Sequence, residues 1–423
     1  MTPSLLEGNV LFRALYCLLA ASEGNGQFCT PGGAAPFRDG WLPAGWEWLA
    51  FAVVGLVISF LLLSVFLVLL LLYTYVERRL LGRFQGRLGP NRTGPFGLLQ
   101  PVADGIKILS KEDTVPEGAD RWVFNLAPVV MALPVFLVLA VIPFGKDSFL
   151  ADINVAVLYI LAVTSISTLA MFMAGFASAN RYAMFGGMRA VAQLISYEIP
   201  VVLSIVGVVL MAGSMSLTKI VEAQQWPFLL LQPLAFIIFV VASSAEMNRP
   251  PFDLMEAESE IVSGYHIEYA GMKFGLFWLA EYGAVLTNSG IMATLFLKGW
   301  EGPLLPSHLW FLIKVFSFAF VFIWIRATLP RLRIDQVMAF AWKFLLPLSL
   351  INVFITATEV LWLGEVVTQD GWSRWVFSGA DLSLMAGINL VVAVAGIVVF
   401  GKLVRLGEAP ARVASAPLPM EAS

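Results

Sequence analysis

Charged residues are scarce in this 423-residue sequence. Asp, Glu, Lys and Arg make up 13% of it, whereas 59% of the residues are hydrophobic. A chain of this composition cannot cover itself with a water-compatible surface, which excludes a soluble globular protein. The formal net charge is −3, and the basic residues are spread over the loops rather than gathered on one face. We therefore expect no nucleic-acid partner.

Cysteine and histidine are scarce too, with two of each. Two thiols cannot hold a four-thiolate iron–sulfur cluster, and His266 and His308 fall on opposite sides of the membrane predicted below, so they cannot share a metal or ligate one haem. A G-x-x-x-x-G-K-[ST] loop is missing, and the glycines between Gly82 and Gly97 follow an apparent helix rather than a strand, so they form no nucleotide cradle. We expect no FMN, iron–sulfur cluster, haem or metal bound by this chain.

What the sequence contains instead is long apolar stretches. A membrane-spanning helix needs about 20 predominantly apolar residues. The sequence predicts an all-α fold, a polytopic membrane helix bundle of about nine transmembrane helices. The predicted spans lie near Trp48–Tyr75, Val123–Phe144, Val155–Phe176, Ala190–Ala212, Phe228–Ser244, Tyr269–Phe296, Leu309–Thr328, Phe344–Leu363 and Leu382–Val404.

These stretches divide the chain into four parts. Residues 1–47 are predicted to be an extracytoplasmic or interfacial segment, in which the apolar patch around Leu11–Ala21 favours an interfacial helix over a cleaved signal. Residues 48–363 form an eight-helix domain, residues 364–406 an outer loop and a ninth transmembrane helix, and residues 407–423 a disordered cytoplasmic tail. Cys17 and Cys29 lie in the first part, where a disulfide is permitted but not required.

The basic residues are divided unevenly between the two sides of the membrane. Eighteen Lys and Arg residues fall on one side and six on the other. Positively charged loops stay in the cytoplasm. We therefore expect a multi-pass protein with its N-terminus outside and its C-terminus in the cytoplasm.

The cytoplasmic sequence after the first span has an unusual pattern. Glu77-Arg78-Arg79 ends the span, a stretch rich in glycine and proline follows, and Leu98–Lys111 is predicted to be an amphipathic helix lying along the membrane surface. The apolar residues of one face are Leu99, Val102, Ile106 and Leu109. An alternative is a helix that only anchors the chain to anionic lipid. The glycine and proline spacing favours a fixed loop path, which anchoring does not need.

Several carboxylic acids lie within or beside the predicted spans. Glu198 and Glu281 fall inside spans, and Glu246 closes the fifth span. An ionisable residue at such a depth is functional by default. The alternative is that each acid pairs with an arginine and only holds helices together. Glu359, near the outer end of the eighth span, is expected to snorkel to the membrane surface.

A second group of acids lies in the loop after the fifth span. It comprises Asp253, Glu256, Glu258 and Glu260, against the single base Arg249. If Phe252–Ser263 is helical, three of these acids share one face and repel one another. Burial and like charge raise the pKa of carboxyl groups. Groups that exchange protons near neutral pH suit a proton pathway.

The motifs together resemble a known family. They closely resemble the H subunit of NADH-quinone oxidoreductase, respiratory complex I, over roughly Trp48–Leu363. The resemblance rests on Glu77-Arg78-Arg79, Gly97-Leu98-Leu99-Gln100-Pro101 with Ala103-Asp104, Arg189 with Ala192-Gln193 and Ser196-Tyr197-Glu198, Ala245 to Asp253 with Glu256, Glu258, Ser259 and Glu260, and the later Arg326-Ala327-Thr328, Arg331, Arg333, Asp335-Gln336 and Trp342-Lys343. The N-terminal 47 residues and the ninth span fall outside the eight-helix pattern of the family.

The resemblance implies a function and a set of residues. It implies a component of an NADH:quinone oxidoreductase, a proton-translocating enzyme of the bacterial inner membrane, that is catalytic only within its complex. Its partners would be hydrophilic-arm subunits, neighbouring membrane-arm subunits and lipid, and its substrate a quinone such as ubiquinone or menaquinone. The implied quinone-chamber residues are Arg79, Gln85, Arg87, Asp104, Lys107, Arg249, Phe252 and Asp253. The implied proton-coupling residues are Glu198, Glu246, Glu256, Glu258, Glu260 and Glu281.

Two other functions are open at this point. The homologous membrane subunit of an energy-converting hydrogenase or formate hydrogenlyase would share the scaffold without a dedicated quinone tunnel. A stand-alone proton-coupled transporter would also explain acids in spans. Transporters typically show paired repeats with broken helices, and the sequence shows no convincing internal repeat.

Overall fold

The computed structural model describes residues 47–146, 148–255, 262–369 and 372–407. Three predictions lie outside the described residues. They concern the N-terminal segment with Cys17 and Cys29, the loop acids Glu256, Glu258 and Glu260, and the C-terminal tail beyond Gly407.

The described chain is a bundle of α-helices with one two-stranded hairpin. The elements are α4 (Glu47–Phe84), η1 (Pro95–Gly97), α5 (Gln100–Ser110), α6 (Arg121–Leu139), α7 (Ala156–Thr164), α8 (Ile166–Ala177), α9 (Arg181–Ala212), α10 (Leu217–Ala223), α11 (Phe228–Leu231), α12 (Pro233–Glu246), η2 (Gly264–His266), α14 (Gly271–Phe296), α15 (Ser307–Thr328), α16 (Ile334–Phe340), η3 (Ala341–Leu345), α17 (Leu346–Leu363), β1 (Glu365–Gln369), β2 (Trp372–Val376) and α18 (Gly379–Gly407).

The helices confirm a polytopic membrane bundle. Within the described residues, seven helices are long and apolar enough to cross a membrane, and α12 is a shorter apolar helix. The 26-residue helix α14 fills the sixth predicted span but contains Lys273 and Glu281. Each of the nine predicted spans coincides with a helix or a pair of consecutive helices.

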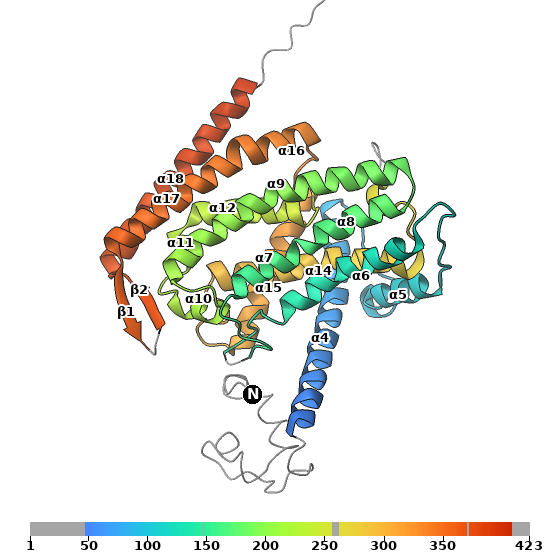
Figure 1. The fold of residues 1–423 in the computed structure, drawn as a ribbon, viewed down its shortest axis with the longest axis horizontal. Coiled ribbons are helices and arrows are strands. Elements are labelled where there is room, and N and C mark those ends of the chain that lie inside the picture. Colours follow the sequence, from blue (N-terminus) through green and yellow to red (C-terminus); the bar gives the residue numbers. More distant parts are fainter. Residues whose placement is uncertain (1–46, 147, 256–261, 370–371, 408–423) are drawn as a thin grey trace, which may run out of the picture.

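Most of the spanning helices lie side by side, whereas α4 crosses them. In Figure 1, α6, α9, α12 and α17 run in similar directions, and α4 runs steeply across that direction. At 1.5 Å per residue, the 38 residues of α4 extend about 57 Å, longer than the roughly 30 Å hydrocarbon core. The surface helix α5 lies at one end of the bundle, and the β1–β2 hairpin lies at the opposite end (Figure 1).

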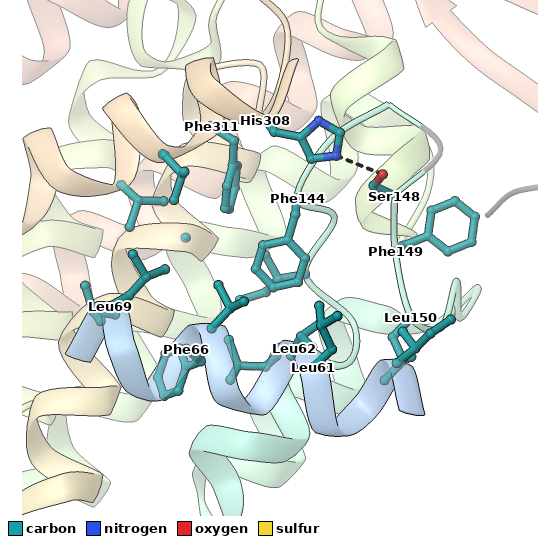
Figure 2. A pocket seen from close by; sticks show the side chains of 18 of the residues that line it. Leu61, Leu62, Phe66, Leu69, Phe144, Ser148, Phe149, Leu150, His308 and Phe311 are labelled. Carbon is teal, nitrogen blue, oxygen red and sulfur yellow. Dashed lines mark hydrogen bonds between the residues drawn. The ribbon is translucent and has the colours of Figure 1, made fainter. Parts of the chain in front are cut away.

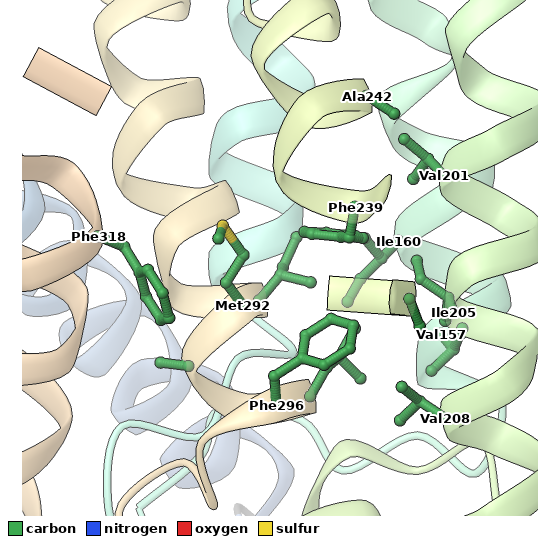
Figure 3. Close-up of a cluster of buried hydrophobic side chains, with 14 of the residues drawn as sticks. Val157, Ile160, Val201, Ile205, Val208, Phe239, Ala242, Met292, Phe296 and Phe318 are labelled. Carbon is green, nitrogen blue, oxygen red and sulfur yellow. The ribbon is translucent and has the colours of Figure 1, made fainter. Parts of the chain in front are cut away.

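Figure 3 shows part of the main core, where apolar side chains of α7, α9, α12, α14 and α15 meet. Val157 of α7, Ile205 of α9, Phe239 of α12 and Phe296 of α14 are fully or almost fully buried in it. The rings of Phe239 and Phe296 lie 5.7 Å apart. In a membrane such packing replaces the hydrophobic effect as the force between helices, because lipid tails are as apolar as the side chains.

The third predicted span is interrupted at Ser165, between α7 and α8. The hydroxyls of Thr164, Ser165 and Ser167 donate to the carbonyls of Leu161, Ala162 and Thr164, at 3.1, 2.9 and 2.7 Å. Hydroxyls that bond back to the preceding turn bend a helix. Three bonds of this kind in close succession explain the interruption.

The fifth predicted span is interrupted at Gln232, between α11 and α12. Gln232 has φ −131° and ψ 61°, and Pro233 begins α12. A proline disfavours the helical conformation of the residue before it. The Gln232 side chain donates to the carbonyl of Gly207 at 3.1 Å and to the Thr356 hydroxyl at 3.2 Å, so the break places an amide in the middle of the bundle.

Two stretches have local structure that the sequence analysis did not specify. Phe252 to Met255, the first part of the stretch considered as a possible helix, are non-helical. Residues 364–406, predicted to hold an outer loop and a ninth helix, contain α18 and begin with an antiparallel hairpin in which Glu365 pairs with Val376 and Gln369 with Trp372. The sequence carried a signal for it, since Asp370-Gly371 is a preferred two-residue hairpin loop.

The predicted sidedness can be tested by cysteine labelling. In a version without native cysteines, Asn91→Cys should react with a membrane-impermeant thiol reagent only from the cytoplasm, and Glu365→Cys only from outside. Both side chains are accessible, so labelling does not require local opening. Labelling of both from one side would contradict the fold, and a reversed pattern would contradict the orientation.

Candidate functional site

Arg249 lies at the centre of a buried group of ion pairs. Its Nη1 atom lies 2.9 Å from Oε1 of Glu77, and its Nε atom lies 3.3 Å from Oε1 of Glu281. Glu77 also pairs with Arg326. The Arg249 guanidinium stacks 4.4 Å from the ring centroid of Tyr282. We call Glu77, Arg249, Glu281 and Arg326 the Arg249 network.

Four separate parts of the chain supply the Arg249 network. Glu77 comes from α4, Glu281 from α14, Arg326 from the last turn of α15, and Arg249 from the loop after α12. Asn248 has φ 54°, a left-handed conformation that asparagine tolerates better than most residues. This turn lets the backbone amide of Arg249 donate to the Ser244 carbonyl at 3.2 Å.

The electrostatics of the network are balanced. The side chains of Glu77 and Arg249 are 1% and 4% exposed, so an unpaired charge on either would be costly. Burial lowers the pKa of Arg249, but the carboxylates of Glu281 and Glu77 outweigh this and raise it above its ordinary value. Two arginines face two carboxylates, and Arg249 stays charged.

The network adjoins a small cavity with a few polar groups in a mostly apolar wall. The cavity has a volume of about 50 Å³ and contains Glu246 and Glu281 in its wall. Thr164 and Ser167, on either side of the interruption at Ser165, also line it. A water molecule needs roughly 10–15 Å³ of such space, so the cavity has room for water between the two carboxyl groups.

Glu198 extends this row of acids. It is half-buried on α9 and close enough to Glu246 for the two charges to interact. Its neighbour Tyr197 is fully buried and donates its hydroxyl hydrogen to the Val337 carbonyl at 2.9 Å. The structure therefore brings Glu198, Glu246 and Glu281 into one region.

Asp253 connects the loop to the last helices. Its carboxylate pairs with Arg331 at 2.7 Å, and its charge acts on both Glu281 and His266. Burial lowers the pKa of His266 to about 4, and the negative charge of Asp253 offsets only part of this shift. His266 is therefore neutral at pH 7 beside an ion pair.

Phe252 is part of the core rather than of an open surface. It is 4% exposed, and its ring lies 5.3 Å from that of Tyr197. Gln193 donates to the carbonyls of Phe252 and Ala245, at 2.9 and 2.8 Å. Of the predicted chamber residues, Phe252 and Arg249 are thus placed to brace the neighbouring loops, since neither has a free surface.

On the other side of α4, Asp104 holds the surface helix α5. The Asp104 carboxylate pairs with Arg78, accepts from Gln100 at 3.1 Å, and lies 4.0 Å from Nζ of Lys107. Arg79 donates to the Tyr75 hydroxyl and to the Phe96 carbonyl, the latter at 2.8 Å. Both arginines at the end of α4 therefore bind the segment that follows the helix.

Three other predicted chamber residues are exposed. Arg87 donates from Nε to the Gln85 side chain at 2.8 Å, and both residues are exposed, as is 75% of the Lys107 side chain. The apolar face of α5 is also uncovered, because Val102, Ile106 and Leu109 are 44%, 62% and 68% exposed. These groups remain available to lipid, substrate or a partner.

Glycines allow the loop before α5 to pack against α4. A Cβ atom at Gly89 would lie 2.9 Å from the Cα of Arg79, and one at Gly82 would lie 2.9 Å from the backbone nitrogen of Gly89. At Gly97 it would lie 2.3 Å from the Pro90 carbonyl oxygen, and φ there is +82°. The expected fixed loop path is thus explained by close backbone contact.

The larger pocket lies elsewhere. It measures about 360 Å³ and lies between α4, α14, α15 and the loop after α6. Figure 2 shows Phe144 and Phe311 facing the side chains of α4, with His308 bonded to Ser148 at one edge; that bond is 2.9 Å. None of the predicted site residues lines it. A lining this apolar can hold hydrocarbon but offers little for proton transfer.

The expectation for Glu359 was wrong. It does not snorkel, because it is 6% exposed and its Oε2 accepts from Nδ2 of Asn389 at 2.7 Å. Asn389 belongs to the ninth helix, α18, so the partner that keeps Glu359 inside is contributed by a helix 30 residues away in sequence.

Sequence reasoning missed the pairing of Glu77 with both Arg249 and Arg326. Glu77 and Arg326 were noted only as parts of motifs. A signal was available for Glu77, because an acid next to two arginines at the end of a long apolar helix must either reach water or find a buried partner. Which arginine it binds depends on the packing of α4 against α14 and α15.

Comparison with known proteins gives consistent matches. A family model described as NADH dehydrogenase matches residues 57–357. The chain is 53% identical over 352 residues to the NADH-quinone oxidoreductase H subunit of Dehalococcoides mccartyi (strain CBDB1), covering 83% of this chain and 96% of that protein. It is 49% identical over 329 residues to the NADH-quinone oxidoreductase H 2 subunit of Syntrophobacter fumaroxidans, covering 75% and 99%, and 51% identical over 309 residues to the corresponding H subunit of Geobacillus kaustophilus, covering 71% and 92%.

Replacing Arg249 tests the network. Arg249→Ala leaves Glu281 without its closest cation, and removing one partner of a buried ion pair costs about 3–5 kcal/mol. We expect a lower thermal midpoint and less assembled protein on native gels. Arg333→Ala is the matched control, because 78% of that side chain is exposed, and it should be nearly neutral. If the loss reflects stranded charge, adding Glu281→Gln to Arg249→Ala should restore part of the stability, because it leaves Glu77 paired with Arg326; no recovery would contradict the electrostatic account.

Proposed function

The chain belongs to the H-subunit family of NADH-quinone oxidoreductase, and on that premise we propose that it forms one wall of the quinone chamber and links that chamber to proton movement through the Arg249 network. It is a multi-pass membrane subunit of this oxidoreductase and works with the other subunits of the complex. The single observation that carries the proposal is the buried series Glu77, Arg249 and Glu281, which continues into the cavity lined by Glu246.

The family assignment favours this function over the two alternatives. The named relatives are subunits of NADH-quinone oxidoreductase rather than of a hydrogenase, and they match over nearly their whole length. The interruptions at Ser165 and Gln232 resemble the broken helices of transporters, but each is explained by local chemistry. The transporter function therefore has no specific observation in its favour.

The proposed quinone contacts are the exposed groups at the end of α4. Gln85 and Arg87 offer an amide and a guanidinium to a carbonyl oxygen of the quinone, and Lys107 offers an ammonium from α5. A cation near that oxygen stabilises the negative charge that develops during reduction. The apolar face of α5 and the adjoining membrane suit a long hydrocarbon tail. Arg79 and Asp104 brace this surface, since both are engaged in holding the loop and α5.

The proposed coupling step uses the buried acids. Reduction of a quinone to a quinol takes up two electrons, which another subunit of the complex delivers, and two protons, and negative charge develops transiently on the quinone oxygens between these steps. Arg249 can transmit that change because it binds two carboxylates, and a stronger pull from one weakens its hold on the other. A proton can then move between Glu281 and Glu246 through water in the cavity, and onward to Glu198. The loop acids Glu256, Glu258 and Glu260 stay predicted members of this pathway.

The proposed contact between Arg87 and quinone can be tested with Arg87→Ala. The change removes an exposed side chain whose only described bond is to Gln85, so folding should be unaffected. We expect quinone-dependent NADH oxidation to fall about tenfold, roughly 1.4 kcal/mol of transition-state stabilisation, while NADH oxidation by a hydrophilic artificial acceptor stays normal. Arg92→Ala, in the same loop and also exposed, is the control. Equal loss of both activities would instead indicate failed assembly.

The proposed proton pathway through the buried acids can be tested with Glu246→Gln. Glutamine keeps the shape and hydrogen bonding of the side chain but removes its titratable proton. We expect quinone-dependent NADH oxidation and proton uptake in membranes to fall at least tenfold, about 1.4 kcal/mol in the barrier, in complexes whose amount has been checked on native gels. Glu281→Gln should behave alike. Asp335→Asn, with a side chain that is 73% exposed, should be near normal. Normal rates and proton yields in both glutamine variants would remove Glu246 and Glu281 from the pathway.

A further inference from the structure

A second polar site lies between α17 and α18, away from the Arg249 network. Glu359 and Asn389 are 6% and 1% exposed and bond to each other at 2.7 Å. Both lie beyond residue 357, where the match to the family model ends. A bond between a carboxyl group and an amide inside a membrane bundle is a specific attachment between two helices.

The polar residues of α17 form one continuous face toward this site. Ser349, Asn352, Thr356 and Glu359 are spaced three, four and three residues apart, and all four are buried. Thr356 accepts from Gln232, at the break between α11 and α12, at 3.2 Å. We call Gln232, Asn352, Thr356, Glu359 and Asn389 the outer polar seam.

The outer polar seam contains more acceptors than donors. Within the part of the chain that the structure describes, four of its buried oxygens have no hydrogen-bond partner, against one nitrogen, the Asn352 amide NH₂ group with its two N–H donors. These oxygens are Oε1 of Gln232, Oδ1 of Asn352, Oε1 of Glu359 and Oδ1 of Asn389. Leaving a buried acceptor unsatisfied costs about 1–3 kcal/mol. The ligand that such a set binds must therefore donate hydrogen bonds.

The surroundings of Glu359 also indicate that the outer polar seam needs hydrogen-bond donors. The described residues give Glu77 and Glu281 arginine partners, but Glu359 has only the amide of Asn389. An isolated carboxylate in apolar surroundings is strongly unfavourable. A protonated carboxyl group avoids this cost and supplies one of the missing donors. Water, with two donors per molecule, can supply the others.

We propose that the outer polar seam is a water-binding site in which Glu359 carries a proton, and that the ninth helix completes it through Asn389. The proposal does not depend on the quinone function. Glu359 lies four residues before Leu363, the last residue of α17, which is about 6 Å along the helix. Protons can therefore reach the seam from the hairpin end of the bundle rather than from the Arg249 network.

The ninth helix is built to present Asn389. Among the described side chains of α18, the buried residues are Leu382, Met385, Asn389, Ala393 and Gly396, spaced three, four, four and three residues apart on one face. A single polar residue on an otherwise apolar face fixes the register between helices. Only one register of α18 places Asn389 opposite Glu359.

Infrared spectroscopy of the purified complex tests the proposal. A protonated carboxyl group has a C=O stretching band separate from the bands of carboxylates. The spectrum of the unmodified complex minus that of Glu359→Gln should contain one such band, and the band should shift in D₂O because water reaches the group. Asn389→Leu keeps a similar volume but removes the amide, and it should shift the band.

Glu365→Gln is the matched control, since this acid lies on β1 outside the bundle and its removal should leave the protonated carboxyl region unchanged. A missing band in the Glu359→Gln difference would show an ionised Glu359 and overturn the proposal. A band that does not respond to D₂O would overturn the water-binding part, and one indifferent to Asn389→Leu would overturn the role of α18. If Glu359→Gln does not assemble, Asn389→Ser carries the test, because a weaker hydrogen bond should still move the band.

Discussion

The position of Arg249 between two carboxylates constrains the rest of the bundle. A guanidinium with its side chain 4% exposed needs partners on more than one side, and those partners come from α4 and α14, while Glu77 also binds Arg326 of α15. Helices that share one ionic centre cannot slide independently, because any shift strands a charge in a poorly solvating medium. The turn at Asn248 is part of the same constraint, since it directs Arg249 into the space between these helices. The small cavity with Glu246 lies next to this centre and is also lined by Thr164 and Ser167, on either side of the interruption at Ser165.

The two interrupted helices have a common effect, although they arise differently. At Ser165 three hydroxyls bend the chain, and at Gln232 a following proline does so. Each interruption leaves polar groups at a depth where lipid could not satisfy them. The first supplies Thr164 and Ser167 to the cavity shared by Glu246 and Glu281, and the second supplies Gln232 to the outer polar seam. The bundle therefore contains two separate polar sites, although its core is apolar. The helices α12 and α14, which contribute Glu246 and Glu281 to the first site, also contribute Phe239 and Phe296 to that core.

Much of the architecture was predictable because it depends on local composition. Apolar stretches of the right length mark all nine spans, and a periodicity of three to four residues marks the face of α5. The acids were also predictable as candidate site residues, because an ionisable residue within a span either has a function or binds a partner. Their partners were not predictable. Glu77 and Arg249 are 172 residues apart, so their pairing follows from tertiary packing alone. Glu359 was expected to snorkel because it lies near the outer end of its span, but its partner, Asn389, lies on the following helix. Arg249 and Phe252 stay predicted chamber residues, but their burial could not be predicted, because it follows from the inward fold of the loop that carries them.

The three glycine contacts at the end of α4 have a mechanical consequence. Backbone packed closely on backbone, as at Gly82 and Gly89, leaves no side chains between the two segments to rearrange. The loop carrying Gln85 and Arg87 is therefore fixed rigidly to α4, and α5 is tied to the same helix through Asp104. A change in the tilt of α4 would move the loop and the surface helix together as one rigid unit. The Arg249 network, which holds α4 at Glu77, would lie close to the point about which they rotate. The membrane itself, through its thickness and lateral pressure on the exposed flank of α4, would then act on the exposed residues that we propose to contact quinone.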